Sequence, residues 1–305
     1  MKKLLAPISI LIAGVLWGFM SVFTRTLSSL GIPAMSISCI RMIVSAVLLW
    51  AFLLIFKRDA LKIKLKHLPF LALIGILTMF LMSVCYVTAI EMTSASVAAI
   101  LLYTSPVFIF IFSLIFFKEK IRLGKVVALV VAVLGCVLVS GIVSGGKFTV
   151  EGLLIGLASG LLYGLYSIFG TMAMRHYSSI TITAYAFLFA ALFSLVFLDY
   201  GAVGTAITVY EPAVWGFLGF VILYALVTAL APFVLYTWGL SRMDASNAGI
   251  LACIEPVVAT LVGIFILQQG TDVFQIIGIL LVLVAIVLIE ITNKKIEKIE
   301  LPNME

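Results

Sequence analysis

Residues 14–23 read GVLWGFMSVF and residues 160–169 read GLLYGLYSIF, so nearly the same stretch occurs twice in this chain. Five of the ten positions are identical. A second pair follows later, where residues 95–106 (ASVAAILLYTSP) match residues 245–256 (ASNAGILACIEP). A repeat of this size indicates two copies of one structural unit that pack against each other.

The composition indicates that the chain folds in a membrane. Hydrophobic residues make up 64% of its 305 residues and charged residues only 10%, and the mean hydropathy is +1.32. Water-soluble domains carry far more charge. The apolar runs are unbroken and have the length of helices that cross ~30 Å of hydrocarbon, which excludes the alternating pattern of a membrane β-barrel.

These runs predict an all-α polytopic membrane protein with ten transmembrane helices. We place the helices near residues 5–28, 33–57, 68–90, 94–117, 123–143, 151–174, 179–199, 213–240, 246–268 and 273–292. The first five-helix repeat occupies residues 1–145, the second occupies residues 146–293, and residues 294–305 form a tail. Because five is odd, the second repeat starts on the opposite side of the membrane and is inverted, as in many transporters.

The basic residues predict the orientation. Of the 19 lysines and arginines, 16 fall on one side of the predicted helices. They are Lys2, Lys3, Lys57, Arg58, Lys62, Lys64, Lys66, Lys118, Lys120, Arg122, Lys125, Arg175, Arg242, Lys294, Lys295 and Lys298. By the positive-inside rule both termini are cytoplasmic. The net charge of +6 therefore indicates membrane orientation, and we expect no nucleic-acid partner.

Two five-helix copies with this pattern resemble the EamA family of the drug/metabolite transporter superfamily. The residues that carry the resemblance are Leu16-Trp17-Gly18, Arg41, the Ser/Ala-rich stretch that leads to Pro106, and Glu255-Pro256. The resemblance covers residues 8–292. It implies a carrier for small metabolites, often an exporter of amino acids or related compounds.

The chain departs from the family pattern after the ninth predicted helix. An acidic residue is common there in the family, and Gln268-Gln269 stands in its place. In the first repeat, Lys118-Glu119 keeps the expected acid.

Glu255 is the one carboxylate that we place deep in a predicted membrane helix, within LACIEPVVATLV. A charge there costs on the order of 3 kcal/mol or more and normally faces a cavity or a partner. The first repeat has Ser105 at this position, and Pro256 next to the acid frees a carbonyl one turn earlier. Glu255 can bind a proton, a cation or a substrate amine. Alternatively, it is protonated or paired with Arg41 and only holds helices together.

Arg41 lies in the second predicted helix and is the other candidate for proton or cation coupling. It can contact a substrate carboxylate or neutralise Glu255. Its depth also permits an arginine that extends to the lipid headgroups.

Aromatic residues recur at matched places in the two repeats. Those that we predict to bind substrate together with Glu255 are Trp17, Tyr86, Tyr103, Tyr163, Tyr166 and Tyr236. Polar aromatic side chains in the middle of a membrane need hydrogen-bond partners or water, which the wall of a cavity provides. Such walls suit an apolar, aromatic or cationic solute. The alternative is ordinary core packing.

Two prolines and a row of glycines predict mechanical features. Pro106 and Pro256 occupy matched places in the fourth and ninth helices, where each should kink its helix, and we predict them to be hinges. The sixth helix has a glycine every fourth residue from Gly152 to Gly164, which allows a neighbouring helix to approach closely.

The chemistry of enzymes is missing from the sequence. The two histidines, His67 and His176, fall in predicted loops, and Cys39, Cys85, Cys136 and Cys253 fall inside predicted helices. No nucleotide-binding, zinc-protease or serine-hydrolase motif occurs. We therefore predict no metal, no cofactor and no enzymatic activity.

The sequence as a whole predicts a secondary transporter in the cytoplasmic membrane. It would move a small organic metabolite, such as an amino acid, an amine or a similar amphipathic solute, by alternating access. Glu255 permits proton coupling, and facilitated flux down the solute gradient is equally compatible. A channel and a membrane enzyme or scaffold for lipid-linked precursors are the alternatives. Each chain contains both halves of a pathway, so a monomer or a homodimer fits.

Overall fold

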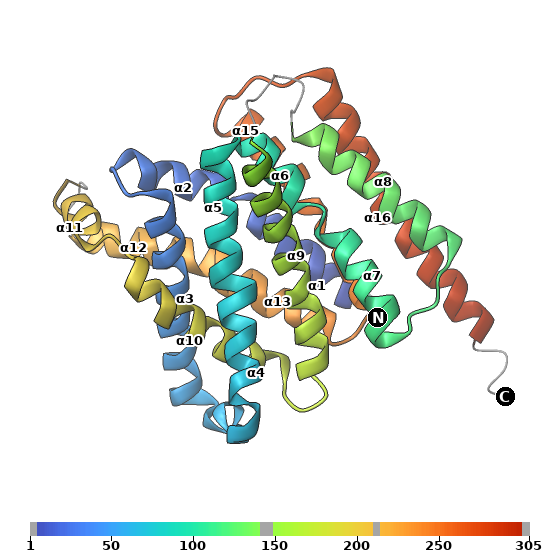
Figure 1. The fold of residues 1–305 in the computed structure, drawn as a ribbon, viewed down its shortest axis with the longest axis horizontal. Coiled ribbons are helices and arrows are strands. Elements are labelled where there is room, and N and C mark those ends of the chain that lie inside the picture. The colour runs from blue at the N-terminus through green and yellow to red at the C-terminus, as the bar shows by residue number, and fades with distance from the viewer. Residues whose placement is uncertain (1–4, 141–148, 210–213, 301–305) are drawn as a thin grey trace.

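The computed structural model describes residues 5–140, 149–209 and 214–300, with the side chains of 293–300 excepted. These residues form helices and no strands. The helices of the first half are α1 (Leu5–Gly18), α2 (Met20–Ser29), α3 (Ala34–Phe56), η2 (Arg58–Leu61), η3 (Leu65–His67), α4 (Leu68–Leu73), η4 (Ile74–Leu81), α5 (Met82–Met92), α6 (Ala95–Leu102), α7 (Ser105–Phe117) and α8 (Leu123–Val139). The chain folds into one helical bundle (Figure 1).

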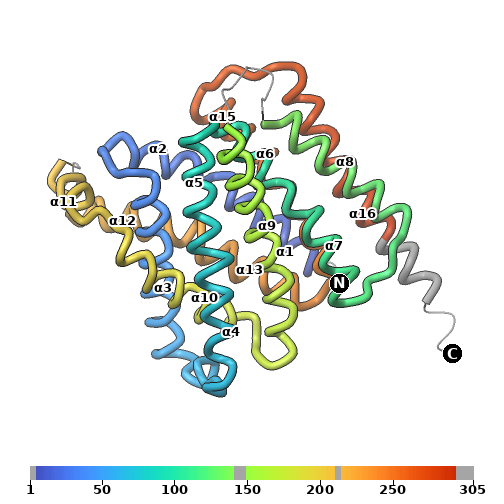
Figure 2. Tube along the Cα trace, viewed as in Figure 1, coloured from blue at the N-terminus to red at the C-terminus, as the bar shows by residue number. Residues whose placement is uncertain are grey.

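The second half follows the same order. Its helices are α9 (Val150–Ala173), α10 (Ser179–Phe197), α11 (Tyr200–Val209), α12 (Val214–Ala225), η6 (Leu226–Leu230), α13 (Ala231–Leu240), α14 (Ala245–Ala252), α15 (Ile254–Phe265) and α16 (Val273–Glu300). Helix α16 runs alongside α8, the last helix of the first half (Figure 2).

Within the described ranges, nine helical stretches are long and apolar enough to cross a membrane. They confirm nine of the predicted spans. The remaining one, near 123–143, corresponds to α8, which has 17 residues and lies alongside α16 at one edge of the bundle (Figure 1). The prediction extends into residues 141–148, which lie outside the described residues, so the count of ten stays a prediction.

Both matched prolines follow a break in a helix. In the first repeat α6 ends at Leu102 and α7 begins at Ser105, while in the second α14 ends at Ala252 and α15 begins at Ile254. Proline cannot donate the backbone hydrogen bond that would join the two pieces, and it is favoured in the first turn of the second piece. The two kinks expected from the sequence are therefore present, and motion about them stays a prediction.

Other backbone features recur at matched places in the two repeats. The third membrane-length stretch of each repeat contains a π-helical segment, which is wider than an α-helix. This segment is η4 in the first half and η6 in the second. Lys118 and Gln268, 150 residues apart, both adopt a left-handed conformation, with φ of 54° and 53°. The next residue then donates its N–H back into the helix, from Glu119 to Ser113 and from Gln269 to Gly263. The two repeats thus share a detailed backbone path.

The repeats interlock through glycines of their first helices. Gly14 of α1 lies against the break between α14 and α15, where an added Cβ would stand 3.4 Å from the backbone nitrogen of Glu255. Gly160 of α9 lies against the break between α6 and α7, 2.6 Å from the hydroxyl of Thr104 on the same measure. The first helix of each repeat therefore packs on the broken helix of the other, and only a missing side chain allows this approach.

Two features of the fold were not predicted from the sequence. The first helix is itself broken at Phe19, between α1 and α2, whereas its counterpart α9 is continuous. The short helix α11 packs Ala206 against Leu27 and Phe217 in a small cluster separate from the main core. The break at Phe19 changes the direction of the chain next to Glu255.

Candidate functional site

A cavity of about 700 Å³ lies between the two repeats, a size typical of sites for small organic ligands. Its walls come from α1, α2, α3, α5, α6, α8, α9, α12, α13, α15 and α16. The predicted site residues on these walls are Trp17, Arg41, Tyr86, Tyr103, Tyr163, Glu255 and Pro256. Residues that are far apart in the sequence therefore meet at one place.

Glu255 stands at the break between α14 and α15, with its carboxylate on the cavity. Its side chain is buried. Tyr103 donates a hydrogen bond to Oε1 over 3.4 Å, and Tyr163 donates one to Oε2 over 3.2 Å. Both bonds are long for an O–H donor to a carboxylate. The two oxygens also have further lone pairs, which can accept from a third donor.

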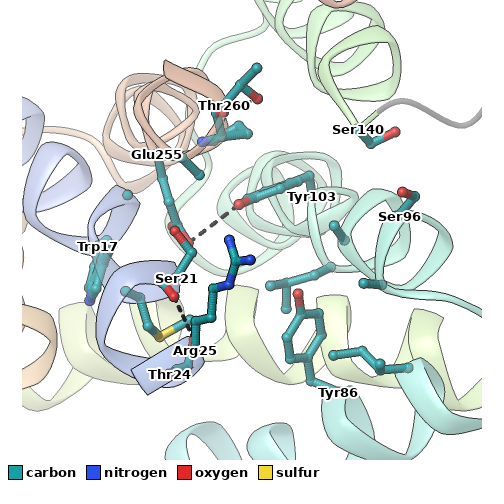
Figure 3. Close-up of a pocket in the computed structure, with 18 of the residues that line it drawn as sticks. Trp17, Ser21, Thr24, Arg25, Tyr86, Ser96, Tyr103, Ser140, Glu255 and Thr260 are labelled. Carbon is teal, nitrogen blue, oxygen red and sulfur yellow. Dashed lines mark hydrogen bonds between the residues drawn. The ribbon is translucent and has the colours of Figure 1, made fainter. Parts of the chain in front are cut away.

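The two phenols reach Glu255 from different repeats. Tyr103 lies in the break between α6 and α7, and Tyr163 lies in α9 (Figure 3 shows Tyr103). The carboxylate is therefore held from both halves of the molecule at once. A relative movement of the halves would change its hydrogen bonds.

An aromatic cluster adjoins the carboxylate. The ring of Trp17 packs at 6.3 Å from Tyr163, 5.2 Å from Phe233 and 5.5 Å from Tyr236, measured between ring centres. The contacts with Tyr163 and Phe233 are edge-to-face and the contact with Tyr236 is tilted. Ring packing at these distances holds the side chains in place. Trp17, Tyr163 and Phe233 also line the cavity and give it one apolar wall.

Two arginines line the same cavity. Arg41 is buried, donates from Nη1 to the sulfur of Met20 at 2.8 Å, and has no partner for Nε within the described residues. Arg25, on α2, is exposed, and its guanidinium points into the space between Glu255 and Tyr86 (Figure 3). In the described part of the chain neither arginine forms an ion pair with Glu255.

Three predicted residues lie elsewhere. Tyr166 and Tyr236 line a small second cavity behind the aromatic cluster, where Tyr166 bonds to Thr237 and Tyr236 bonds to Ser167, each over 2.7 Å. Their hydroxyls are occupied in the contact between α9 and α13, so the structure does not bring them to the large cavity. Pro106 is buried against Gly249 of α14 and is also absent from the walls of the large cavity.

The sequence analysis missed several polar residues of the cavity, among them Arg25, Ser96, Ser140, Gln269 and Gln275. Each lies near the end of a predicted helix, where polar residues are expected in any membrane protein. The departure at Gln268-Gln269 from the family pattern was the one available signal.

The cavity extends from Glu255 to one end of the bundle. Its outer part is formed by Ser28, Ser140 and Gln269, which lie at the ends of α2, α8 and α15. This is the end that we predict to face away from the cytoplasm. At the opposite end Lys125 is buried among Glu119, Asp244 and Ser246. The cavity is thus accessible from one side of the bundle.

The sequence profile of the EamA-like transporter family matches residues 4–141 and, a second time, residues 150–291. The chain belongs to the EamA-like transporter family. The two matches correspond to the two halves described above, and together with the apolar helices they establish a multi-pass membrane protein with a transporter role.

Individual relatives agree in length and architecture. An uncharacterized transporter of Archaeoglobus fulgidus is 28% identical over 92% of this chain and 94% of its own length. The uncharacterized transporter YoaV of Bacillus subtilis is 27% identical over the same shares. A solved structure described only as the crystal structure of a protein is 20% identical, with a TM-score of 0.77 over 96% of this chain and 98% of the other. That likeness concerns the fold alone.

Proposed function

We propose that this member of the family is a secondary carrier of the cell membrane for a small amphipathic solute that bears an ammonium group. The observation that carries the proposal is Glu255, a buried carboxylate on the cavity whose described partners are two long phenolic hydrogen bonds. A buried carboxylate is stable only with a proton or a positive partner. A substrate ammonium group supplies that partner.

The other walls of the cavity restrict the class of solute further. Trp17, Tyr163 and Phe233 provide an apolar and aromatic surface beside the carboxylate. Arg25 and Arg41 provide positive charge across the cavity from it. A solute that carries both an ammonium and a carboxylate group, with an apolar side chain, satisfies all three surfaces. An α-amino acid of medium size has this chemistry.

The placement of the site supports alternating access as the mechanism. Glu255 lies where a broken helix of one repeat meets the first helix of the other, and its two phenolic partners come from different repeats. Rocking of one repeat against the other would then expose the same carboxylate to each side in turn. The positive-inside rule assigns the cytoplasm to the end with Lys125, so the cavity described here opens outward.

Proton coupling is a second part of the proposal. When the solute leaves, the carboxylate of Glu255 loses its positive partner and can take up a proton in its place. Solute and proton would then compete for one group and move in opposite directions. The alternative is facilitated flux down the solute gradient, in which no proton replaces the solute on Glu255.

The test is counterflow in liposomes that contain the purified protein and a pH-sensitive dye. Amino acids, amines and nucleobases are compared, with and without an imposed pH gradient. We expect saturable exchange of zwitterionic amino acids and a change in internal pH that follows their movement. Flux that rises linearly with concentration would indicate a channel. Exchange of neutral nucleobases alone would contradict a role for Glu255 in binding an ammonium group.

A further inference from the structure

The closed end of the bundle is held by one buried lysine. Lys125 Nζ donates to Glu119 Oε2 at 3.0 Å, to Asp244 Oδ2 at 3.1 Å and to Ser246 Oγ at 2.9 Å. The hydroxyl of Ser246 also donates to Glu119. An ammonium group has three donors, and each has an acceptor here. The side chains of Lys125 and Glu119 are 4% and 9% exposed, so their ion pair is shielded from water, whereas Asp244 is 55% exposed at the edge of the group.

This group of four residues, which we call the inner cluster, joins the two repeats. Glu119 and Lys125 belong to the connection between α7 and α8 and the first turn of α8, in the first repeat. Asp244 and Ser246 lie at the start of α14, in the second repeat. The start of α14 is separated from Glu255 by about 15 Å of helix at 1.5 Å per residue. The cluster therefore joins the two repeats between Glu255 and the predicted cytoplasmic side.

The repeat assigns a counterpart to each of the four. Glu119 and Lys125 correspond to Gln269 and Gln275, and Asp244 and Ser246 correspond to Ser94 and Ser96, each 150 residues away. The register is reliable because the left-handed residues Lys118 and Gln268 precede the first pair. We call Ser94, Ser96, Gln269 and Gln275 the outer cluster.

The outer cluster is open in this structure. Ser96, Gln269 and Gln275 line the cavity toward its outer end. Ser94 caps its own helix by accepting from the N–H of Val97, and Gln275 Nε2 donates to the carbonyl of Val139 at 3.3 Å. Among the described residues, no hydrogen bond joins one member of the outer cluster to another. The same positions are therefore together at one end and apart at the other.

We propose that the two clusters are the two gates of the carrier, one charged and one neutral. When the inner cluster separates, the outer cluster comes together in the arrangement that its counterpart has here. This inference rests on the alternating access proposed above. Hydrogen bonds between charged groups are stronger than those between amides and hydroxyls. The inner gate therefore closes more tightly, and the empty carrier rests with its cavity open outward.

The test measures the width of the outer mouth without any solute. Spin labels are attached at Ser28→Cys and Ser140→Cys, which both line the cavity, after replacement of Cys39, Cys85, Cys136 and Cys253 by alanine. Pulsed electron paramagnetic resonance gives the distribution of distances between the labels. Lys125→Met leaves two acids without their cation, and we expect the short-distance population to rise about tenfold or more.

A matched control removes a lysine whose ion pair lies within a single repeat. Lys62 pairs with Asp59 at 2.7 Å within one loop, and both side chains are largely exposed. Exposed pairs of this kind contribute little, so Lys62→Met should leave the distances unchanged. A folded Lys125→Met protein with the same distances as the parent would overturn the proposal.

A second variant keeps the test decisive if Lys125→Met does not fold. The triple change Ser94→Asp, Gln269→Glu and Gln275→Lys transfers the charged set to the outer end and leaves the inner cluster intact. We expect it also to raise the short-distance population about tenfold, because both gates then close with equal strength. Unchanged distances in this variant would overturn the proposal as well.

The distance measurement tests the gates and the counterflow assay tests the proposed function, so the failure of one proposal can be distinguished from the failure of the other. A gate response without any transported solute contradicts the proposed function and leaves the gates standing. Saturable transport with unchanged distances in both variants contradicts the gates and leaves the proposed function standing.

Discussion

The breaks before Pro106 and Pro256 share a backbone path but differ in what surrounds them. At the first break Ser105 is buried beside α9, on the small second cavity. At the second break Glu255 occupies the same position and faces the large cavity. The comparison shows that both repeats supply the broken helix, whereas only the second places a carboxylate directly before the proline.

The neighbouring helix explains the difference. At the first break α9 runs on without interruption, and Gly164 brings it against the carbonyl of Ser105. At the second break α1 ends at Gly18 and α2 takes a new direction after Phe19. The side chains of α2, including Ser21 and Arg25, then line a space in front of Glu255. A break in one helix thus opens the site at a break in another.

The most severe way to test this comparison is Glu255→Gln. The amide cannot balance an ammonium group or take up a proton, so we expect exchange to fall about 100-fold, as the loss of a charged hydrogen bond in a shielded site predicts. Any residual exchange should no longer depend on pH. Counterflow between pH 5 and 8 measures both effects.

The control for that change is the matched position in the first repeat. Ser105→Ala removes a hydroxyl at the break that lies off the large cavity, and we expect exchange to change by less than about twofold. Equal losses in Glu255→Gln and Ser105→Ala would mean that both variants act through the helix break.

The next largest effects are expected from alanine substitutions of the glycines that pack against the two breaks. In Gly160→Ala the new methyl group would meet the carbonyls of Leu101 and Leu102 and the hydroxyl of Thr104. A backbone carbonyl cannot move aside, so we expect the free energy of unfolding to fall by about 1–3 kcal/mol. In Gly14→Ala the first obstacle is the Cγ2 methyl group of Ile254, and a small shift of this side chain relieves part of the clash, which a backbone carbonyl does not allow.

The unfolding temperature in detergent measures this difference. Gly160→Ala should unfold at a lower temperature than Gly14→Ala, and both below the parent. The reverse order would show that the two breaks are packed differently from the structure described here.

A smaller effect is expected for the phenol that reaches Glu255 from the second repeat. Tyr163→Phe keeps the ring against Trp17 and removes a hydrogen bond of 3.2 Å to the carboxylate. Because the bond is long, we expect exchange to weaken about three- to tenfold. The concentration dependence of counterflow measures it. Removal of the weaker bond in Tyr103→Phe, at 3.4 Å, should have a smaller effect.

The smallest effect on transport is expected at Tyr166, which we had predicted to bind substrate. Tyr166→Phe loses the bond to Thr237 behind the cavity wall, so the free energy of unfolding should fall by about 1 kcal/mol. Counterflow should stay within about twofold of the parent. A large loss of exchange with unchanged stability would show that Tyr166 takes part in substrate binding.

Much of the site was predictable because its residues break a rule of membrane composition. Glu255, Arg41 and Trp17 are polar or amphipathic in the middle of apolar runs, and such residues normally face a cavity or a partner. Tyr166 and Tyr236 carry the same signal but satisfy their hydroxyls with neighbouring side chains. Sequence alone does not separate these two outcomes, because it does not record which helix lies opposite.

The sequence by itself determined the membrane class, the two repeats and the kinks at Pro106 and Pro256. These follow from local chemistry, since apolar runs must be helical in lipid and proline cannot continue a helix. Only the tertiary structure decided that α1 breaks at Phe19 and that Arg25 shares a cavity with Glu255. It also decided that Lys125 closes the opposite end. Contacts between the repeats produce these features, and such contacts depend on how two sets of helices fit together in space.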